Sequence, residues 1–564
     1  MGSNGLSFTL LSALFFMALV AWVSYQKTRG EADTRDGYFL AGRGLTGWFI
    51  AGSMLLTNLS AEQLIGLNGS SYAFNMSSMA WEVTVAFATI ILALLFLPRY
   101  LAGAFSTLPE FLRSRFDDDV RRLTALLFLV GYGLVTIPSV LYSGSLAVLR
   151  IFDVPSMLNV DDSTSLWITV AIVAMVGGVY AIFGGLKAVA VSDTLNGIGL
   201  LIIGAIVPVL GLAKLGGGSV AAGFATITST HAEKLNAIGG ADDPTPFGTV
   251  FTGMIFANLF YWGTNQYVIQ RTLGAKNLAE GQKGVLLSGY LKLLIPFMMM
   301  IPGVIAFHLY GPGLDPIDLA FPQLVRDVLP GYLSGFLLAV LLGAVFSSFN
   351  SLLNSAATLF CLDLYLPLKG SAVSDERLIK VAKRAGILIA LFSIVLAPLF
   401  QYAPEGLWQI IRIFTGFYNI PVIAVVVIGL FTTRVPPLGP KLAVLFHVVA
   451  YGLLQFVIKP DLHFVHIYGI LFVVEVLLML AIGRILPLSE PRVASHRPQV
   501  DLSPWPLAPA ASVNLLAFVA LIYLVFSPLG LASGSLGLPF WAATASILAL
   551  DSMACSWLLR RVAR

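Results

Sequence analysis

Hydroxyl and amide side chains recur inside an otherwise apolar stretch at residues 344–360, AVFSSFNSLLNSAATLF. Residues three or four positions apart share one face of a helix. Most of the polar residues of this stretch therefore fall on one face: Ser347, Ser351, Asn354, Ser355 and Thr358. Such a face suits a hard cation, which takes oxygen ligands. The alternative is a face of small polar residues that only packs against other helices.

Two more apolar stretches carry too many amides and glycines to be unbroken, lipid-facing helices. LTNLSAEQLIG at 56–66 contains Asn58 and Gln63, and TGMIFANLFYWGTNQYVIQR at 252–271 contains Asn258. Interrupted helices at corresponding positions of two halves indicate a transporter of inverted repeats with its site at the middle of the bilayer. The alternative, polar side chains that join helices, does not explain why the two stretches lie five spans apart.

An unwound membrane helix exposes backbone carbonyls that can line a site. We therefore expect the carbonyls of Leu56 and Leu59 to combine with the hydroxyls of Ser347 and Ser348. Together these oxygens would hold a sodium ion without any carboxylate.

Two lone charges, Glu82 and Lys292, also lie inside apolar spans. Charged residues there mark functional sites by default, although Lys292 could instead extend toward the cytoplasmic face. A polyhydroxylated ring needs hydrogen-bond donors, acceptors and aromatic faces against its C–H surface. The residues that meet this need are Gln63, Glu82, Asn258, Tyr261, Trp262 and Lys292.

The remaining ionisable residues predict little chemistry. Asp193 follows the turn FGGLKA at 183–188 and would either release sodium to the cytoplasm or cap a helix. Glu475 and Asp551 are given no transport role. All six histidines are expected at span ends or in loops, and no metal cluster, catalytic triad or phosphate loop is evident. We therefore expect no enzyme activity and no organic cofactor.

The composition indicates the class of protein whose elements must position these residues. The chain has 564 residues, of which 57% are hydrophobic and 11% are charged, whereas soluble domains have about 25% charged residues. A soluble multidomain enzyme, a disordered chain and a nucleic-acid-binding protein are thereby excluded. The chain is expected to be an all-α polytopic protein of the lipid bilayer, with no obligate protein partner evident.

A membrane-spanning helix needs about 20 apolar residues. Fifteen segments meet this requirement: 7–25, 45–68, 77–98, 123–148, 164–183, 188–212, 248–270, 284–309, 331–362, 385–402, 406–431, 440–458, 464–483, 512–527 and 537–557.

Basic residues accumulate on the cytoplasmic side of membrane proteins. With the N-terminus outside, 26 of the 33 lysines and arginines fall on the cytoplasmic side and five on the other side. We therefore predict an external N-terminus and a cytoplasmic C-terminus in a plasma (inner) membrane.

Four runs in order resemble the solute:sodium symporter family: NLSAEQLIG, YAIFGGLKAV, NLFYWGTNQYVIQRTLGAK and FSSFNSLLNSAATLF. The likeness extends from about residue 7 to about residue 530. It implies a LeuT-type core of two inverted five-helix repeats with flanking helices, about 15 transmembrane helices in all. The expected parts are an N-terminal helix and loop (1–43), the first repeat (44–213), an external loop (214–247), the second repeat (248–434) and flanking helices (435–564).

The resemblance also implies roles for individual residues. The sugar contacts of the family correspond to Gln63, Glu82, Asn258 and Lys292, with Tyr261 as the inner gate and Trp262 beside it. Its sodium site corresponds to the carbonyls of Leu56, Leu59 and Ala344 and the hydroxyls of Ser347 and Ser348. Its outer gate corresponds to Leu67, Trp81 and Trp408.

One departure bears on the substrate. Sugar-transporting members usually carry a Gln where this chain has Arg412 in WQIIRIFTG. Arg412 could pair with Glu82 beside a neutral hexose, or it could bind the carboxylate of an acidic sugar through two parallel hydrogen bonds. The sequence predicts sodium-coupled import of a monosaccharide by alternating access, with an acidic sugar, a carboxylate or a polyol as the alternative substrate.

Overall fold

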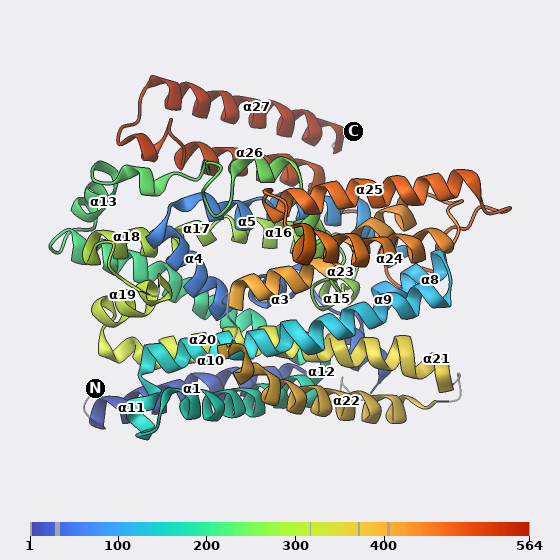
Figure 1. Cartoon of the computed structure of the whole chain (residues 1–564), viewed down its shortest axis with the longest axis horizontal. Coiled ribbons are helices and arrows are strands. Elements are labelled where there is room, and N and C mark those ends of the chain that lie inside the picture. The colour runs from blue at the N-terminus through green and yellow to red at the C-terminus, as the bar shows by residue number, and fades with distance from the viewer. Residues whose placement is uncertain (1–2, 29–33, 316, 370–372, 403–406, 563–564) are drawn as a thin grey trace.

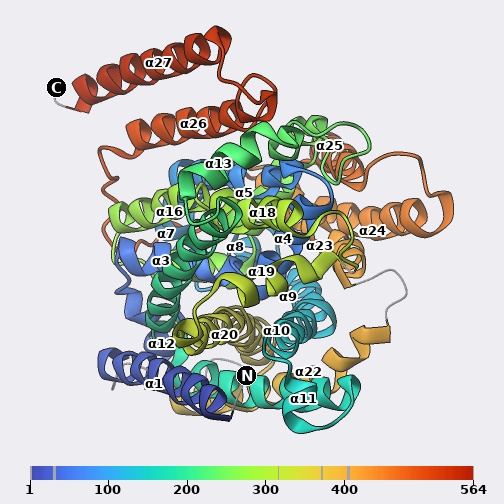
Figure 2. The ribbon, with the colours of Figure 1, turned by 90° about the vertical axis from the view of Figure 1, so that its left-hand side faces the viewer.

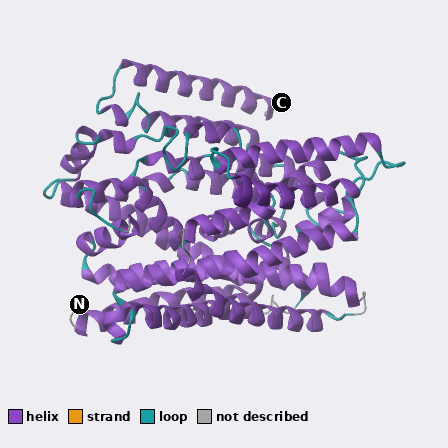
Figure 3. Ribbon diagram, in the orientation of Figure 1, coloured by secondary structure: helices purple, strands orange, loops and turns teal. Residues whose placement is uncertain are grey.

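The computed structural model describes residues 3–28, 34–315, 317–369, 373–402 and 407–562. Within these ranges it leaves out the side chains of residues 3–6, 35, 61–62, 150–151, 179–185, 318, 407–413 and 562. The described chain is almost entirely helical (Figure 3), and its only β contacts are two isolated bridges, Leu45 with Ala275 and Asn277 with Asp501.

The N-terminal part contains α1 (Ser3–Thr28), α2 (Arg35–Leu40), α3 (Gly47–Asn58), α4 (Ala61–Ala73), α5 (Ala80–Val83), α6 (Val85–Ile91), α7 (Leu97–Ala102), α8 (Leu108–Arg115), α9 (Asp118–Gly131), α10 (Ile137–Phe152), α11 (Val154–Leu158) and α12 (Asp162–Leu215). The middle part contains α13 (Val220–Ser229), α14 (Met254–Gly263), α15 (Gln266–Leu273), α16 (Leu278–Lys292), α17 (Ile295–Met299), α18 (Ile301–Tyr310), α19 (Ala320–Val328), α20 (Ser334–Leu359), α21 (Leu366–Lys369), α22 (Asp375–Leu396) and α23 (Leu407–Phe431). The last part contains α24 (Leu438–Leu453), α25 (Phe464–Ile485), α26 (Ala508–Val525) and α27 (Leu538–Val562).

Short turns of other helix types join or extend these helices. The π-helical turns are η4 (Leu92–Phe96), η5 (Tyr132–Thr136), η10 (Phe360–Tyr365) and η12 (Leu454–Ile458). The 3-10 turns are η2 (Ala41–Arg43), η3 (Met76–Met79), η6 (Ala232–Leu235), η7 (Phe247–Phe251), η8 (Ile317–Leu319), η9 (Gly331–Leu333), η11 (Ala397–Tyr402) and η13 (Leu531–Ser533).

The helices form a bundle with a buried centre. Figures 1 and 2 show α1, α11 and α22 along one side, α26 and α27 along the opposite side, and α3, α4, α20 and α23 between them. The most apolar stretch of α20 is 89% buried, so this helix lies at the centre although its sequence is rich in hydroxyls. The most apolar stretch of α27 has no buried residue and faces away from the bundle.

Each of the fifteen expected segments coincides with helical residues. In the described part of the chain, eleven helices are long and apolar enough to cross a membrane, or twelve if α16 and the bent segment after it count as one span. The other expected segments lie in interrupted or shorter helices, so the number fifteen stays a prediction. The turn expected at 183–188 falls inside the bounds of α12.

Candidate functional site

The first interruption lies between α3 and α4. Leu59 leaves the helical conformation with φ −74° and ψ 97°. Ser60 then caps α4, because its Oγ accepts a hydrogen bond from the Gln63 backbone N–H at 3.2 Å. Ser and Thr are preferred at this capping position. The expected break at residues 56–63 is therefore present, and the last carbonyls of α3 have no intrahelical N–H to accept.

A second interruption separates α14 from α15. The N–H groups of Thr264 and Asn265 both donate to the Phe260 carbonyl, which closes α14, and α15 starts at Gln266. The Asn265 side chain accepts a hydrogen bond from the Tyr132 hydroxyl. The two stretches that the sequence predicted to be too polar for unbroken helices are thus both interrupted.

The hydroxyl-bearing face of α20 lies against the first break. Ser348 Oγ donates to the Thr57 carbonyl at 3.1 Å, and the hydroxyls of Thr57 and Ser351 lie 3.2 Å apart. The side chains of Ser347 and Ser348 are buried. The structure therefore brings Ser348 to the carbonyl end of α3, where its observed partner is Thr57.

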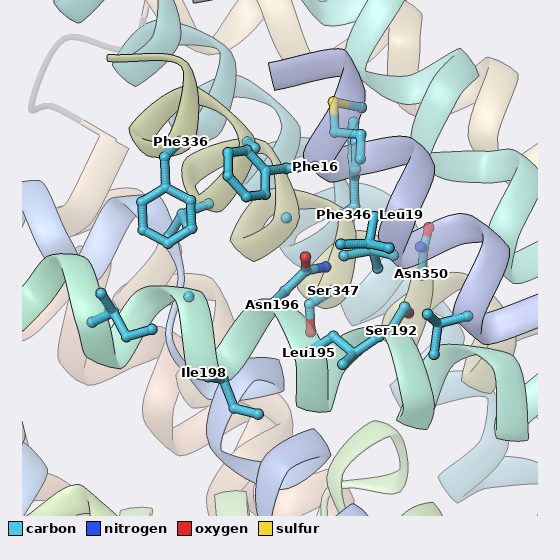
Figure 4. Close-up of a pocket in the computed structure, with 18 residues that line it drawn as sticks. Phe16, Leu19, Ser192, Leu195, Asn196, Ile198, Phe336, Phe346, Ser347 and Asn350 are labelled. Carbon is cyan, nitrogen blue, oxygen red and sulfur yellow. The ribbon is translucent and has the colours of Figure 1, made fainter. Parts of the chain in front are cut away.

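Ser347 and Ser348 face different cavities. Ser348 lines the large central cavity, and Ser347 lines a second cavity of about 270 Å³ between α1, α12 and α20 (Figure 4). Consecutive residues of a helix point about 100° apart, which places the two hydroxyls on either side of one wall.

A buried guanidinium joins the elements around the break. Arg271 of α15 donates to Ser53 Oγ at 3.0 Å and to Ser351 Oγ, and it lies 3.8 Å from Asp193 Oδ2. Ser53 Oγ in turn donates to Asp193 Oδ2 at 2.6 Å. Arg271 is 0% exposed. Arg271 directly follows the expected span 248–270 and was assigned no role in the site, so this network was not predicted.

Glu82 and Lys292 form a second buried charge cluster. The ammonium of Lys292 contacts Glu82 Oε2, and the two side chains are 1% and 3% exposed respectively. Gln63 Nε2 donates to Glu82 Oε1 at 3.1 Å, and the Lys292 ammonium lies 5.9 Å from the Trp262 ring centre. Lys292 therefore does not extend to the membrane surface; α3–α4, α5, α14 and α16 converge on one ion pair.

Of these side chains, Gln63, Glu82 and Trp262 line a central cavity of about 950 Å³. Its wall includes Asn58, Gln63, Glu82, Asn258, Tyr261 and Trp262. The cavity also reaches Thr245 and Ile317 in two of the predicted external connections. Asn258 is held in place because its Nδ2 donates to Thr84 Oγ1 at 2.8 Å. The cavity thus offers donors, acceptors and aromatic faces within one enclosure.

The model of the sodium:solute symporter family matches residues 38–444, which is more than half of the chain. The chain belongs to the sodium:solute symporter family. The symporter is 43% identical to an uncharacterized symporter, YidK, of Escherichia coli K12, over 92% of this chain and 90% of that protein. It is 30% identical to a sodium/glucose cotransporter of Vibrio parahaemolyticus, over 78% and 84% of the two chains.

Similarities to a human protein and to a solved structure complete the comparison. The human sodium/myo-inositol cotransporter 2 is 31% identical over 80% of the symporter and 70% of its own length. A sodium-coupled sialic acid symporter in an outward-open state superposes with a TM-score of 0.75 at 19% identity, covering 86% of the symporter and 99% of that chain. The fold is therefore that of the LeuT-type transporters, and the chain is a multi-pass, sodium-coupled solute symporter.

The expected gates are only partly described. Leu67 and Trp81 line the central cavity, and Trp81 stacks on Phe464 of α25 at 6.4 Å between ring centres. Tyr261 lies 5.7 Å from the rings of both Trp262 and Tyr267. The side chains of Trp408 and Arg412 lie outside the described residues.

One sequence expectation about the histidines is wrong. His447 was expected at a span end, but it lies within α24 and is completely buried beside Glu475 of α25. Glu475 falls inside the expected span 464–483, so its position was predicted although its partner was not.

Proposed function

We propose that the symporter couples sodium to the import of a neutral polyhydroxylated ring, a monosaccharide of the hexose class. The observation that carries this proposal is the buried Glu82–Lys292 pair, of which Glu82 lines the central cavity beside Gln63. Each charge is already compensated by the other. A neutral ring can therefore accept from Lys292 and Gln63 and donate to Glu82 without leaving a buried charge unpaired.

The relatives support a ring-shaped polyol. Two of them are named for glucose and for myo-inositol, and both of these solutes are six-membered rings that carry several hydroxyl groups. Asn258 would add a further amide contact, and the faces of Tyr261 and Trp262 would cover the C–H surface of the ring.

The sodium site in this proposal consists of the carbonyls of Leu56, Leu59 and Ala344 and the Ser348 hydroxyl. The Ser347 hydroxyl, which lines the second cavity here, would complete the site by turning toward them. Its support is that Ser348 already donates to a carbonyl at the end of α3. Sodium between α3 and α20 would hold the break in place and thereby position Gln63 at the start of α4. Each ligand then raises the affinity of the other by the same factor, typically 5–150-fold.

Alternating access would follow from this linkage. The ring closes the outer aromatic gate of Leu67, Trp81 and Trp408, and the core then opens past Tyr261 toward the cytoplasm. Asp193 beside Arg271 would receive the departing ion, because the Ser347 hydroxyl lies next to its carboxylate.

Uptake into proteoliposomes tests the substrate class. Neutral hexoses, cyclic polyols and hexuronates are compared with and without an inward sodium gradient. We expect sodium-dependent uptake of a neutral ring, abolished when sodium is replaced by potassium. Uptake of hexuronates alone would contradict the proposal. If the Arg412→Gln variant then transported neutral rings in place of hexuronates, the acidic-sugar alternative would be established.

We also infer that the N-terminus lies outside a plasma membrane and the C-terminus in the cytoplasm. The support is the distribution of basic residues along the sequence. Labelling with an impermeant thiol reagent tests the orientation after Cys361 and Cys555 have been replaced by Ser. Asp242→Cys should react in intact cells, and Glu490→Cys should react only after permeabilisation.

A further inference from the structure

A buried ionisable pair lies outside the proposed transport path. His447 of α24 and Glu475 of α25 are both 0% exposed. His447 Nδ1 lies 2.5 Å from Glu475 Oε1, and His447 Nε2 lies 3.0 Å from the carbonyl oxygen of Gly416 in α23. Glu475 Oε2 has no hydrogen-bond partner among the described residues. The pair therefore connects both flanking helices to one helix of the second repeat.

The helices are close-packed where the pair sits. A Cβ atom on Gly416 would lie 2.3 Å from the Tyr451 hydroxyl of α24, so only glycine permits this approach. The His447 ring stacks on Tyr451 at 5.4 Å between ring centres. Helices α23, α24 and α25 also lie side by side in Figures 1 and 2.

The hydrogen bonds fix the number of protons that the pair holds. A carbonyl oxygen only accepts, so His447 Nε2 must carry a hydrogen to bond Gly416. The separation of 2.5 Å between Nδ1 and Oε1 then requires one more proton between them. Without it, two lone pairs would face each other. Imidazolium with carboxylate and imidazole with carboxylic acid both satisfy this count, and both are neutral overall.

We propose that His447 and Glu475 form a proton-binding site that holds α23 against α24 and α25. When this interface opens to water, the two side chains titrate separately, with ordinary pKa values of about 6.5 and about 4.3. Above pH ~6.5 the opened pair therefore holds one proton fewer than the closed pair. Since the closed state binds more protons, its stability relative to the open state falls as pH rises, by up to about tenfold per pH unit.

Other titratable side chains near the pair do not account for this dependence. Tyr451 and Tyr468 interact with each other beside it, and Tyr418 of α23 lies instead near Thr136. Tyrosines ordinarily stay neutral until about pH 10. Lys441, at the start of α24, is held by Asp117 at 2.7 Å.

Hydrogen exchange of α23 tests the site directly. Protection of the backbone amides of residues 414–431 is measured at pH 6.5 and pH 8.5 in the whole chain and in Glu475→Gln. The glutamine amide can donate to Nδ1 while Nε2 keeps its bond to Gly416, so the hydrogen bonds persist without a titrating carboxyl. The ratio of the protection factors of the two proteins is used, because the intrinsic pH dependence of exchange cancels in it.

We expect the protection of the unaltered chain relative to Glu475→Gln to fall by up to about 50-fold between the two pH values. An equal ratio at both pH values would overturn the proposal. Glu376→Gln serves as the control, because Glu376 is an exposed carboxylate bonded to Lys380 at 2.6 Å. This variant should keep the pH dependence of protection that the unaltered chain shows. If Glu475→Gln does not fold, the double variant His447→Phe, Glu475→Leu should show the same loss of pH dependence. The outcome is independent of the proposed sodium and sugar sites.

Discussion

Ser348 is the hydroxyl that the structure places on the carbonyl end of α3, so its removal is the most direct test of the sodium site. We predict that Ser348→Ala raises the sodium concentration for half-maximal uptake by about fivefold, since one neutral polar contact contributes about 1 kcal/mol. The control Ser393→Ala removes a buried hydroxyl from α22 and should leave sodium activation unchanged. Equal sodium activation in Ser348→Ala and the unaltered chain would argue against the site.

The Glu82–Lys292 pair predicts a different pattern. Removal of one member leaves the other charge buried and unpaired, which costs about 3–5 kcal/mol. We expect Glu82→Gln and Lys292→Met each to lower the melting temperature and to reduce uptake at least 100-fold. The double variant should recover the melting temperature but not the uptake, which separates folding from substrate binding.

An exposed ion pair provides the matched control. Lys214 and Asp327 lie 3.5 Å apart and are each about two-fifths exposed, and such pairs contribute about 0–1 kcal/mol. Lys214→Ala should change neither the melting temperature nor the uptake appreciably. Normal uptake by both single variants of the buried pair would remove it from the substrate site.

Single residues were predictable where the surrounding span was clearly apolar. Glu82, Lys292 and the Ser347–Ser348 pair were recognised because polar groups are costly in hydrocarbon. Arg271 was missed because it follows an amide-rich helix and precedes a loop, where a basic residue is ordinary. Its burial depends on Ser53, Asp193 and Ser351, which come from three distant segments, and no local pattern encodes that meeting.

At the scale of elements, the break between α3 and α4 depends on its cap. Ser60 Oγ accepts from the Gln63 N–H, and loss of an N-cap costs about 1 kcal/mol. We predict that Ser60→Ala raises the half-saturating concentrations of both sodium and substrate by about fivefold, because it loosens the helix that carries Gln63. Ser60→Asp keeps a capping oxygen and should retain affinities closer to those of the unaltered chain; equal losses in both variants would refute the capping role.

Both broken helices could be predicted from the amides and glycines that interrupt their apolar sequence. The exact ends of these helices could not be predicted, because a break shows in composition over about ten residues, whereas only Leu59 and Ser60 leave the helical conformation between α3 and α4. The position of His447 was misjudged for a related reason. His447 lies seven positions after the start of the predicted span at 440. A lone histidine there gives no local sign of Glu475, its partner in the next helix.

At the scale of the whole molecule, α27 is the helix most loosely attached. The most apolar stretch of α27 has no buried residue, and α27 packs on α26, where Asn514 donates to Asp551 at 2.8 Å. We predict that a chain ending after Gly530 keeps its uptake rate within about twofold, as expected for changes away from the core.

The matched truncation removes α26 as well. Tyr290 of α16 donates to the Ala511 carbonyl of α26 at 2.8 Å, so α26 is seated on the core. A chain ending after Asp501 should therefore lose thermal stability and uptake. If both truncations abolish uptake alike, α27 has a role that its exposure does not reveal.

The four buried carboxylates among the described residues each have a basic partner: Glu82 with Lys292, Asp193 with Arg271, Asp363 with Arg121, and Glu475 with His447. A voltage of 100 mV exerts about 2.3 kcal/mol of work on each net charge that crosses the bilayer. Paired groups that move together transfer no net charge. When the carrier reorients without its ligands, these pairs should therefore move no net charge across the bilayer. The membrane potential would then drive import mainly through the charge of the bound sodium ion.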